Sequence, residues 1–217
     1  MSRTSNRPRT SGALIALTVV LGGCAGTIGG GSAVDEMHAH FAITGELRAA
    51  ALIGDLEALK DAAGRLARRG AVEGLPREAY PRLYELRRRA EELGTVETIE
   101  QATWGSALLI AECGGCHSEA GAGPAGSFVV GSPPEYLGSD AHAALQGWAM
   151  ERLWEGVIGP ADGPWLAGGL VMSEDEAMTA RPDVGLAIRM VREATSLDDR
   201  ARALGAVLNS CVGCHTG

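Results

Sequence analysis

Mostly apolar residues recur at helical spacing along the chain, and the clearest example is a pair of matching rows. Both rows lead into the same short motif, Cys-x-x-Cys-His, which occupies residues 113–117 and 211–215. In each row the residues stand 18, 14, 7 and 4 positions before the histidine of the motif, so they share one face of a helix. The rows are Ile99, Thr103, Ile110 and Cys113, and Leu197, Ala201, Leu208 and Cys211. The pattern predicts two similar helices that each end in a cysteine motif.

Polar residues mark the beginnings of these two helices. Thr98 and Gln101 have the spacing of a capping box, and Ser196 and Asp199 hold the same relative positions. Glycine and proline punctuate the other helical patterns, and no stretch alternates clearly enough for a strand. The further helices that we expect span residues 34–53, 55–69, 76–93, 139–158, 160–170 and 183–195, with a short helix opened by a capping box at Ser173 and Glu176.

The two motif helices divide the chain into a repeated architecture. We expect an all-α fold of two tandem four-helix-bundle-like units, residues 34–117 and 139–217, each with its motif on its last helix. Residues 118–138 are rich in Gly, Pro and Ser and are expected to form a linker, partly fixed by Phe128 and the two valines after it. The two units are further hypothesised to pack together as an internal pseudo-dimer.

The N-terminus has the pattern of an export signal rather than of a folded element. Three arginines precede an apolar run at residues 13–21, which is too short to span a bilayer because a spanning helix needs about 20 residues. The run ends in Leu-Gly-Gly-Cys at Cys24, which resembles the lipoprotein box of bacteria, where the cysteine is lipidated. We therefore expect a signal peptide at residues 1–23; the alternative is an ordinary signal peptide followed by a chance cysteine.

A lipidated Cys24 would attach the protein to a bacterial membrane through acyl chains alone. The glycine-rich residues 24–33 are expected to form a flexible tether between this anchor and the first unit. Ala25 after the cysteine resembles the sorting pattern of outer-membrane lipoproteins. These features predict a protein that faces the periplasm.

The charge of the chain limits its partners. Removal of residues 1–23 takes away three arginines and no acidic residue, so the formal net charge of −8 becomes −11 in the mature chain. Such an acidic chain, without a basic run, is not expected to bind nucleic acid. The charge instead favours redox partner proteins with basic or neutral surfaces.

The five cysteines consist of Cys24 and two pairs, Cys113 with Cys116 and Cys211 with Cys214. Each pair is followed at once by a histidine, which completes the attachment signature of c-type haem. Two thiols one helical turn apart can each bond to a vinyl group of haem, and the next histidine becomes the proximal iron ligand. The sequence therefore predicts two covalent haems c. Redox dithiols, a zinc site built from all four cysteines, or structural disulfides are the alternatives.

Histidines and glycines complete the two motifs. His117 and His215 are the expected proximal ligands of the iron. Gly114, Gly115 and Gly213 lie between the cysteines, where small residues would let a porphyrin approach the helix.

The placement of each motif on the last helix of its unit resembles the cytochrome c prime family. Members of that family are four-helix bundles with a C-terminal haem motif, and the resemblance covers residues 34–117 and 139–217. The stretch Met37-His38-Ala39-His40-Phe41 is also similar to a Met-x-x-His-Phe segment in the first helix of the family. The resemblance implies that the first helix of each unit crosses the distal face of the haem.

The sixth iron ligand would decide the function. Met37 and His40 share one helical face and are the candidate distal ligands of the first unit, whereas His38 points elsewhere. In the second unit His142 is the candidate, and Met150 is expected to be a core residue. A second histidine or methionine ligand would make the haem an electron carrier, whereas an open position would bind a small gas.

These observations favour electron transfer. The leading hypothesis is an exported, lipid-anchored, di-haem c-type cytochrome that is not an enzyme. The alternative is a gas-binding protein, for NO or CO, with an open haem site, as in cytochrome c prime. A di-haem peroxidase is the enzymatic alternative, but the sequence shows no catalytic group for it beyond the haem motifs. The oligomeric state of the chain and the identity of its redox partners are left open.

Overall fold

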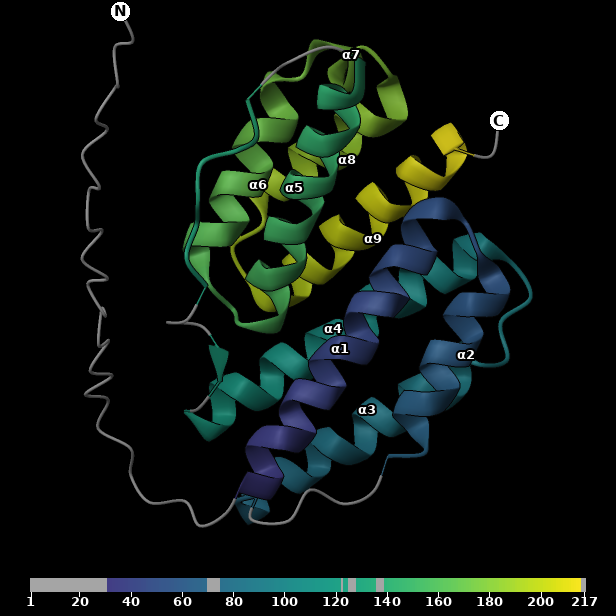
Figure 1. Ribbon diagram of the computed structural model, residues 1–217, viewed down its shortest axis with the longest axis vertical. Coiled ribbons are helices and arrows are strands. Elements are labelled where there is room, and N and C mark those ends of the chain that lie inside the picture. Colours follow the sequence, from purple (N-terminus) through teal and green to yellow (C-terminus); the bar gives the residue numbers. More distant parts are fainter. Residues whose placement is uncertain (1–30, 70–74, 122, 125–127, 136–138, 216–217) are drawn as a thin grey trace, which may run out of the picture.

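The computed structural model describes residues 31–69, 75–121, 123, 124, 128–135 and 139–215, and the regular structure within them is helical throughout (Figure 1). The prediction of an all-α fold is therefore confirmed. Only the backbone is described for residues 31, 32, 139–141, 214 and 215. The expected signal peptide, Cys24 and nearly all of the expected tether lie outside the described residues.

Within the described residues, the first half of the chain folds into four α-helices and one turn of 3₁₀ helix. Asp55 begins the second helix by accepting a hydrogen bond from the backbone N–H of Ala58 at 2.9 Å. Thr98 accepts one from the N–H of Gln101, while the Gln101 side chain accepts from the N–H of Glu97 rather than of Thr98. The elements are α1 (Gly31–Ile53), α2 (Leu56–Ala67), η1 (Arg77–Ala79), α3 (Tyr80–Leu93) and α4 (Ile99–Ala120).

The described part of the second half contains five helices. Ser196 and Asp199 form the expected reciprocal box: each side chain accepts a hydrogen bond from the backbone N–H of the other. The box expected at Ser173 is wrong, because α6 continues through Ser173 and Asp175 caps the next helix instead. The elements are α5 (Ser139–Ile158), α6 (Asp162–Glu174), α7 (Glu176–Thr179), α8 (Pro182–Glu193) and α9 (Leu197–His215).

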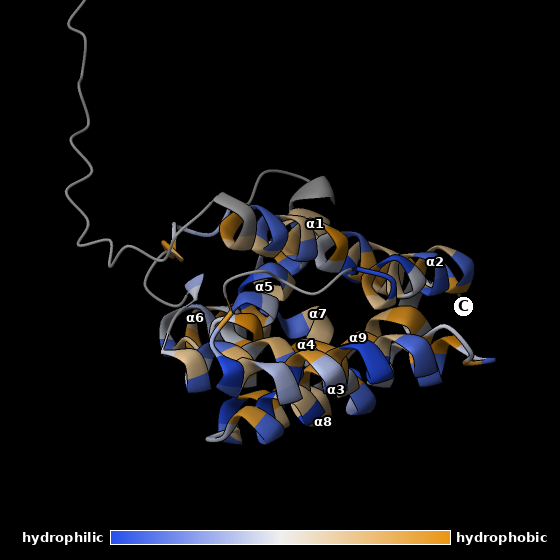
Figure 2. Cartoon of the chain, turned by 90° about the horizontal axis from the view of Figure 1, so that it is seen from below, coloured by the Kyte–Doolittle hydropathy of each residue, from blue (hydrophilic) through white to orange (hydrophobic). Residues whose placement is uncertain are grey.

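The two halves share one hydrophobic core. Helices α1, α2, α3 and α4 pack on one another in the first half, and α5, α6, α8 and α9 do so in the second. Helix α4 also packs on α5 and α9, so the buried apolar residues of both halves form one cluster (Figure 1). Each helix carries polar as well as apolar residues (Figure 2), as expected of helices that bury only one face. The halves therefore pack together, as an internal pseudo-dimer requires.

Helices α4 and α9 run antiparallel across the contact between the halves. Gly114 near the end of α4 approaches Leu197 at the start of α9, and Gly205 in α9 lies under the ring of Trp104 in α4. A Cβ atom on Gly205 would lie 2.5 Å from Trp104, so only glycine allows this approach. The two cysteine motifs consequently lie at opposite ends of the helix pair. Among the described residues, no helix is both long enough and apolar enough to cross a membrane.

Candidate functional site

The first cysteine motif borders a cavity between α1, α3, α4 and the end of α5. The cavity has about 540 Å³ of empty space, a volume that includes space open to solvent. Its walls are mainly apolar. The lining residues are Met37, His40, Phe41, Thr44, Leu75, Arg82, Leu83, Leu86, Glu112, Cys113, Cys116, His117 and Ile158. The structure thus brings the first motif together with both candidate distal ligands of the first unit.

The two thiols of this motif lie one helical turn apart on α4, and both are free. Burial raises the pKa of the Cys113 thiol to about 12, and it also raises the pKa of Cys116. Both thiols are therefore protonated at neutral pH. The thiolates of redox dithiols and of metal sites instead have a lowered pKa, so these surroundings do not favour the dithiol alternative.

The imidazole of His117 is held by the opposite half of the chain. Its Nδ1 atom lies 2.8 Å from the carbonyl oxygen of Ile158, the last residue of α5. A carbonyl can only accept, so Nδ1 carries the proton and Nε2 keeps a free lone pair. Burial lowers the pKa of His117 more than this hydrogen bond raises it. The ring is therefore neutral at neutral pH, which is the state that ligates a metal.

A glycine of the linker packs against the His117 ring. A Cβ atom on Gly123 would lie 2.6 Å from Cγ of His117, and the φ of Gly123 is 147°, which favours glycine. The linker next contacts the other side of the cavity, where the ring centroid of Phe128 lies 6.4 Å from that of Phe41. This contact agrees with the expected role of Phe128, whereas Val129 and Val130 are both exposed.

His40 lines the cavity and carries a buried, unpaired polar atom. Its residue is 8% exposed, and no described group forms a hydrogen bond with its buried Nε2 atom. Burial lowers the pKa of His40, and the nearby positive charge of Arg69 lowers it further, whereas Glu36 acts in the opposite direction. A neutral imidazole with an unused nitrogen costs free energy unless a ligand occupies it. Met37 is half-buried one turn earlier, and His38 is exposed, as expected.

Charged residues form one edge of the cavity, and sequence reasoning missed them. Glu112, beside Cys113, is buried and accepts hydrogen bonds from Arg82 at 3.1 Å and from Arg89 at 2.8 Å. Arg82 also donates to Glu119, two turns further along α4, at 2.6 Å. These ion pairs join α3 to the motif helix. In the sequence, Glu112 is recognisable as an acidic residue within a mainly apolar run, but the sequence does not identify the arginines that pair with it.

The glycines of the first motif have neighbours other than the expected porphyrin. A Cβ atom on Gly114 would lie 2.2 Å from the carbonyl oxygen of Val157, and one on Gly115 would lie 3.0 Å from the guanidinium carbon of Arg82. Packing of protein groups therefore accounts for both residues without a porphyrin. A Cβ atom on Gly213 in the second motif meets nothing within 4 Å among the described residues.

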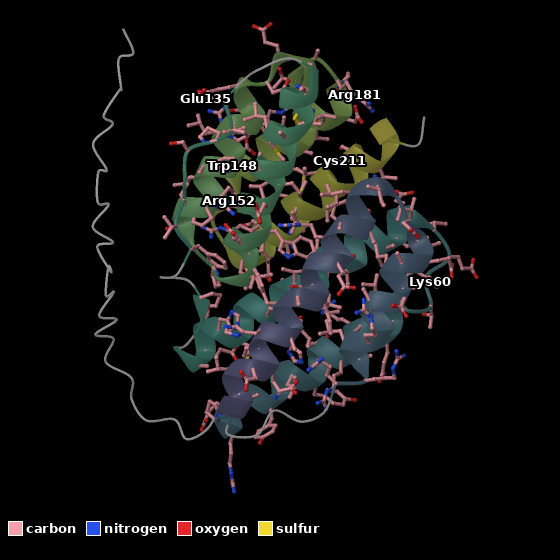
Figure 3. The ribbon with its side chains drawn as sticks, viewed as in Figure 1. Lys60, Glu135, Trp148, Arg152, Arg181 and Cys211 are labelled. Atoms are coloured by element: carbon pink, nitrogen blue, oxygen red, sulfur yellow. The ribbon has the colours of Figure 1, made fainter. Side chains whose placement is uncertain are left out.

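The second motif is described only in part. Cys211 is half-buried on α9 (Figure 3), whereas the side chains of Cys214 and His215 lie outside the described residues. The Nδ1 atom of His142 lies 3.1 Å from Oδ2 of Asp175, and its Nε2 lies 2.5 Å from the side-chain nitrogen of Gln146. Both ring nitrogens of His142 therefore face protein groups. Met150 is a core residue, as expected.

The antiparallel pair α4 and α9 also bears on the zinc alternative. Cys113 lies where α9 begins, and Cys211 is 14 residues further along α9, which corresponds to roughly 20 Å of helix. The thiols of Cys113 and Cys211 therefore do not share one metal site. Within the described part of the chain, no group of three or more histidine, cysteine or acidic side chains is arranged to hold a metal ion.

The residues that surround the first motif come from segments far apart in the sequence: α1, α3, the linker and the end of α5. These segments bring Cys113, Cys116, His117 and His40 to one mainly apolar cavity. Comparisons of the chain with models of protein families, with curated proteins and with solved structures found no match.

Proposed function

We propose that the protein is a di-haem c-type cytochrome that transfers electrons. One observation carries the proposal: Cys113, Cys116, His117 and His40 all line one mainly apolar cavity, the ring of His117 is oriented by a hydrogen bond, and the buried Nε2 of His40 is unpaired. This donor set fits haem c, because it offers two attachment points and two neutral imidazoles.

Each residue of the first site would have a distinct task. Cys113 and Cys116 would hold haem through thioether bonds, and His117 would ligate the iron through Nε2. His40 would supply the sixth ligand, with Met37 as the alternative on the same face. When bound, haem supplies an iron that gains and loses one electron. The apolar walls would limit water around it, and two permanent ligands would leave no open position for a substrate.

The second motif favours the alternative function of gas binding at its own haem. The haem would be attached through Cys211 and Cys214 and ligated by His215. The ring nitrogens of His142 lie beside Gln146 and Asp175, so these protein groups would compete with an iron for this candidate distal ligand. A haem without a sixth protein ligand can bind CO or NO. We therefore propose one closed site for electron transfer and, as the second candidate function, one open site.

The setting of the protein belongs to the same proposal. Export through residues 1–23 and lipidation at Cys24 would place it on the periplasmic side of a bacterial membrane, with the outer membrane as the favoured location. The acidic mature chain supports basic or neutral redox partners rather than nucleic acid. The cytochrome c prime family remains the proposed relationship, in a duplicated form.

The test is an absorption spectrum of the reduced, matured protein with and without CO, combined with a haem count by pyridine haemochrome. We expect two haems c per chain and a CO shift that involves no more than one of them. Two CO-reactive haems would make gas binding the main function. A protein that is exported through a working haem-attachment system but carries no haem would overturn the proposal.

A further inference from the structure

We propose that the first haem site is completed by the opposite half of the chain, with the C-terminal turn of α5 acting as a positioning element for His117. The inference rests on the proposed function and deepens it. The positioning element consists of Val157 and Ile158, which belong to the second half of the chain, and Ile158 lies 41 residues from the motif histidine in sequence.

The hydrogen bond between the halves follows from how a helix ends. The last four carbonyl groups of an α-helix have no partner within the helix, so they must find one elsewhere. Ile158 is the last residue of α5, and its carbonyl oxygen meets Nδ1 of His117 at 2.8 Å. The end of α5 thereby gains a donor, and the imidazole gains a fixed tautomer and orientation.

Two further contacts hold the same turn in place. The carbonyl of Val157 lies against Gly114, where any side chain would collide with it. The carbonyl of Gly156 accepts a hydrogen bond from Arg200 at 3.2 Å, and Arg200 is buried and also pairs with Asp162 at the start of α6. The three carbonyls that end α5 therefore contact α4 or α9. Contacts between protein groups alone therefore hold this turn in place.

The second motif differs at the corresponding position. Val212 stands where the first motif has Gly114, and a Cβ atom on the neighbouring Gly213 would meet nothing within 4 Å among the described residues. Among the described residues, the close approach of a helix end to a motif glycine occurs at Gly114 and not at Gly213. It explains why glycine is needed at residue 114 and not at the corresponding residue 212.

The contact should influence the electronic state of the first haem. A hydrogen bond from Nδ1–H to a carbonyl makes the imidazole more basic and strengthens it as a ligand. A more basic ligand stabilises ferric over ferrous iron, so the bond lowers the reduction potential. The potential of the first haem would then depend on how the two halves pack.

The experiment uses the full-length, haem-loaded protein and the variant Gly114→Ala, with Gly147→Ala in α5 as the matched control, because a Cβ atom on Gly147 meets nothing within 4 Å among the described residues. The added methyl group in Gly114→Ala would displace the end of α5 and weaken the hydrogen bond to His117. We expect one component of the potentiometric titration to shift to higher potential while the other stays unchanged. The control variant should leave this component where it is in the wild type.

A measurement on the wild type keeps the inference testable if Gly114→Ala does not mature. In the NMR spectrum of the reduced protein, the Nδ1 proton of His117 should exchange slowly and show a nuclear Overhauser effect to protons of Ile158 or Gly159. A rapidly exchanging proton without that effect would overturn the inference, as would unchanged potentials in a fully loaded Gly114→Ala variant. The haem count separates failure of this inference from failure of the proposed function. A protein with two haems but without the hydrogen bond between His117 and Ile158 would contradict the inference and leave the proposed function standing.

Discussion

The motif at residues 113–117 and the motif at residues 211–215 have nearly the same sequence but different surroundings. Around the first, α1, α3, the linker and the end of α5 meet and enclose a cavity. The second lies at the C-terminal end of α9, and its described neighbours leave Gly213 open. The comparison teaches that the motif specifies where a haem would be attached, whereas the rest of the fold specifies its distal ligand and its exposure.

Replacement of the motif histidines should have the largest effect. His117→Ala removes the proposed proximal ligand and the partner of the Ile158 carbonyl. The haem count should therefore fall from two to one, or the haem at the first motif should stay attached but lose its low-spin spectrum. His215→Ala should affect only the other haem. The measurement is a haemochrome count with absorption spectra of both variants. Identical spectral losses in the two variants would show that the sites are not independent.

Removal of the proposed sixth ligand should have the next largest effect. His40→Ala should open the first haem, so a CO-induced shift should appear that the wild-type first haem lacks. The variant His142→Ala should add no CO-reactive haem, because His142 already faces Gln146 and Asp175.

The two distal candidates can be separated by a second pair of variants. Met37→Leu keeps the volume of the side chain but removes its sulfur, and it should leave the CO response unchanged if His40 is the ligand. A CO-reactive first haem in Met37→Leu, together with an unreactive one in His40→Ala, would assign the ligand to Met37 instead.

A smaller effect is expected from the linker glycine beside His117. Gly123→Ala would force a side chain into a left-handed backbone conformation and against the imidazole, which should lower the free energy of unfolding by about 1–3 kcal/mol. Gly131→Ala is the control, since a Cβ atom there meets nothing within 4 Å among the described residues. Equilibrium unfolding in denaturant would compare them. Equal stability of the two variants would contradict the described packing of Gly123.

The smallest effect concerns the beginnings of the two motif helices. Hydrogen bonds from Ser196 and Arg202 lower the pKa of Asp199 to about 2, whereas the corresponding residue on α4 is Gln101, which does not titrate. A lowered carboxyl pKa stabilises the fold above the unfolded value of about 4 and loses that effect as the pH falls towards 2. Asp199→Asn should therefore lower stability slightly at neutral pH, with a difference from wild type that disappears in acid. Denaturant unfolding at several pH values measures it, and a difference that persists at low pH would contradict the assignment.

Local patterns predicted the helices well. Apolar periodicity placed the main helices, and the boxes at Thr98 and Ser196 marked the starts of α4 and α9. The prediction at Ser173 was wrong, because Asp175 two residues later offers an oxygen to two backbone N–H groups and acts as the cap. Short-range signals of this kind decide which residues form an element.

The rest of the candidate site could not be predicted, because it depends on contacts between distant segments. The carbonyl of Ile158 is a backbone group, so no residue type announces its role. The sequence predicts that Gly114 leaves room for a porphyrin, whereas in the structure Gly114 packs against the carbonyl of Val157. The unpaired state of His40 likewise depends on burial between helices, which periodicity alone does not give.

The contacts that the end of α5 makes with α4 and α9 also have a consequence for the order of folding. The bond between His117 and Ile158 spans 41 residues, and the bond between Arg200 and Gly156 spans 44. Such contacts form late, since the entropy of closing a loop must be overcome before they are gained. Because the chain is synthesised from its N-terminus, α4 is made before α5, whose end packs against the first motif. The thiols of the first motif are therefore accessible in the nascent chain and become enclosed only when α5 and α9 fold back.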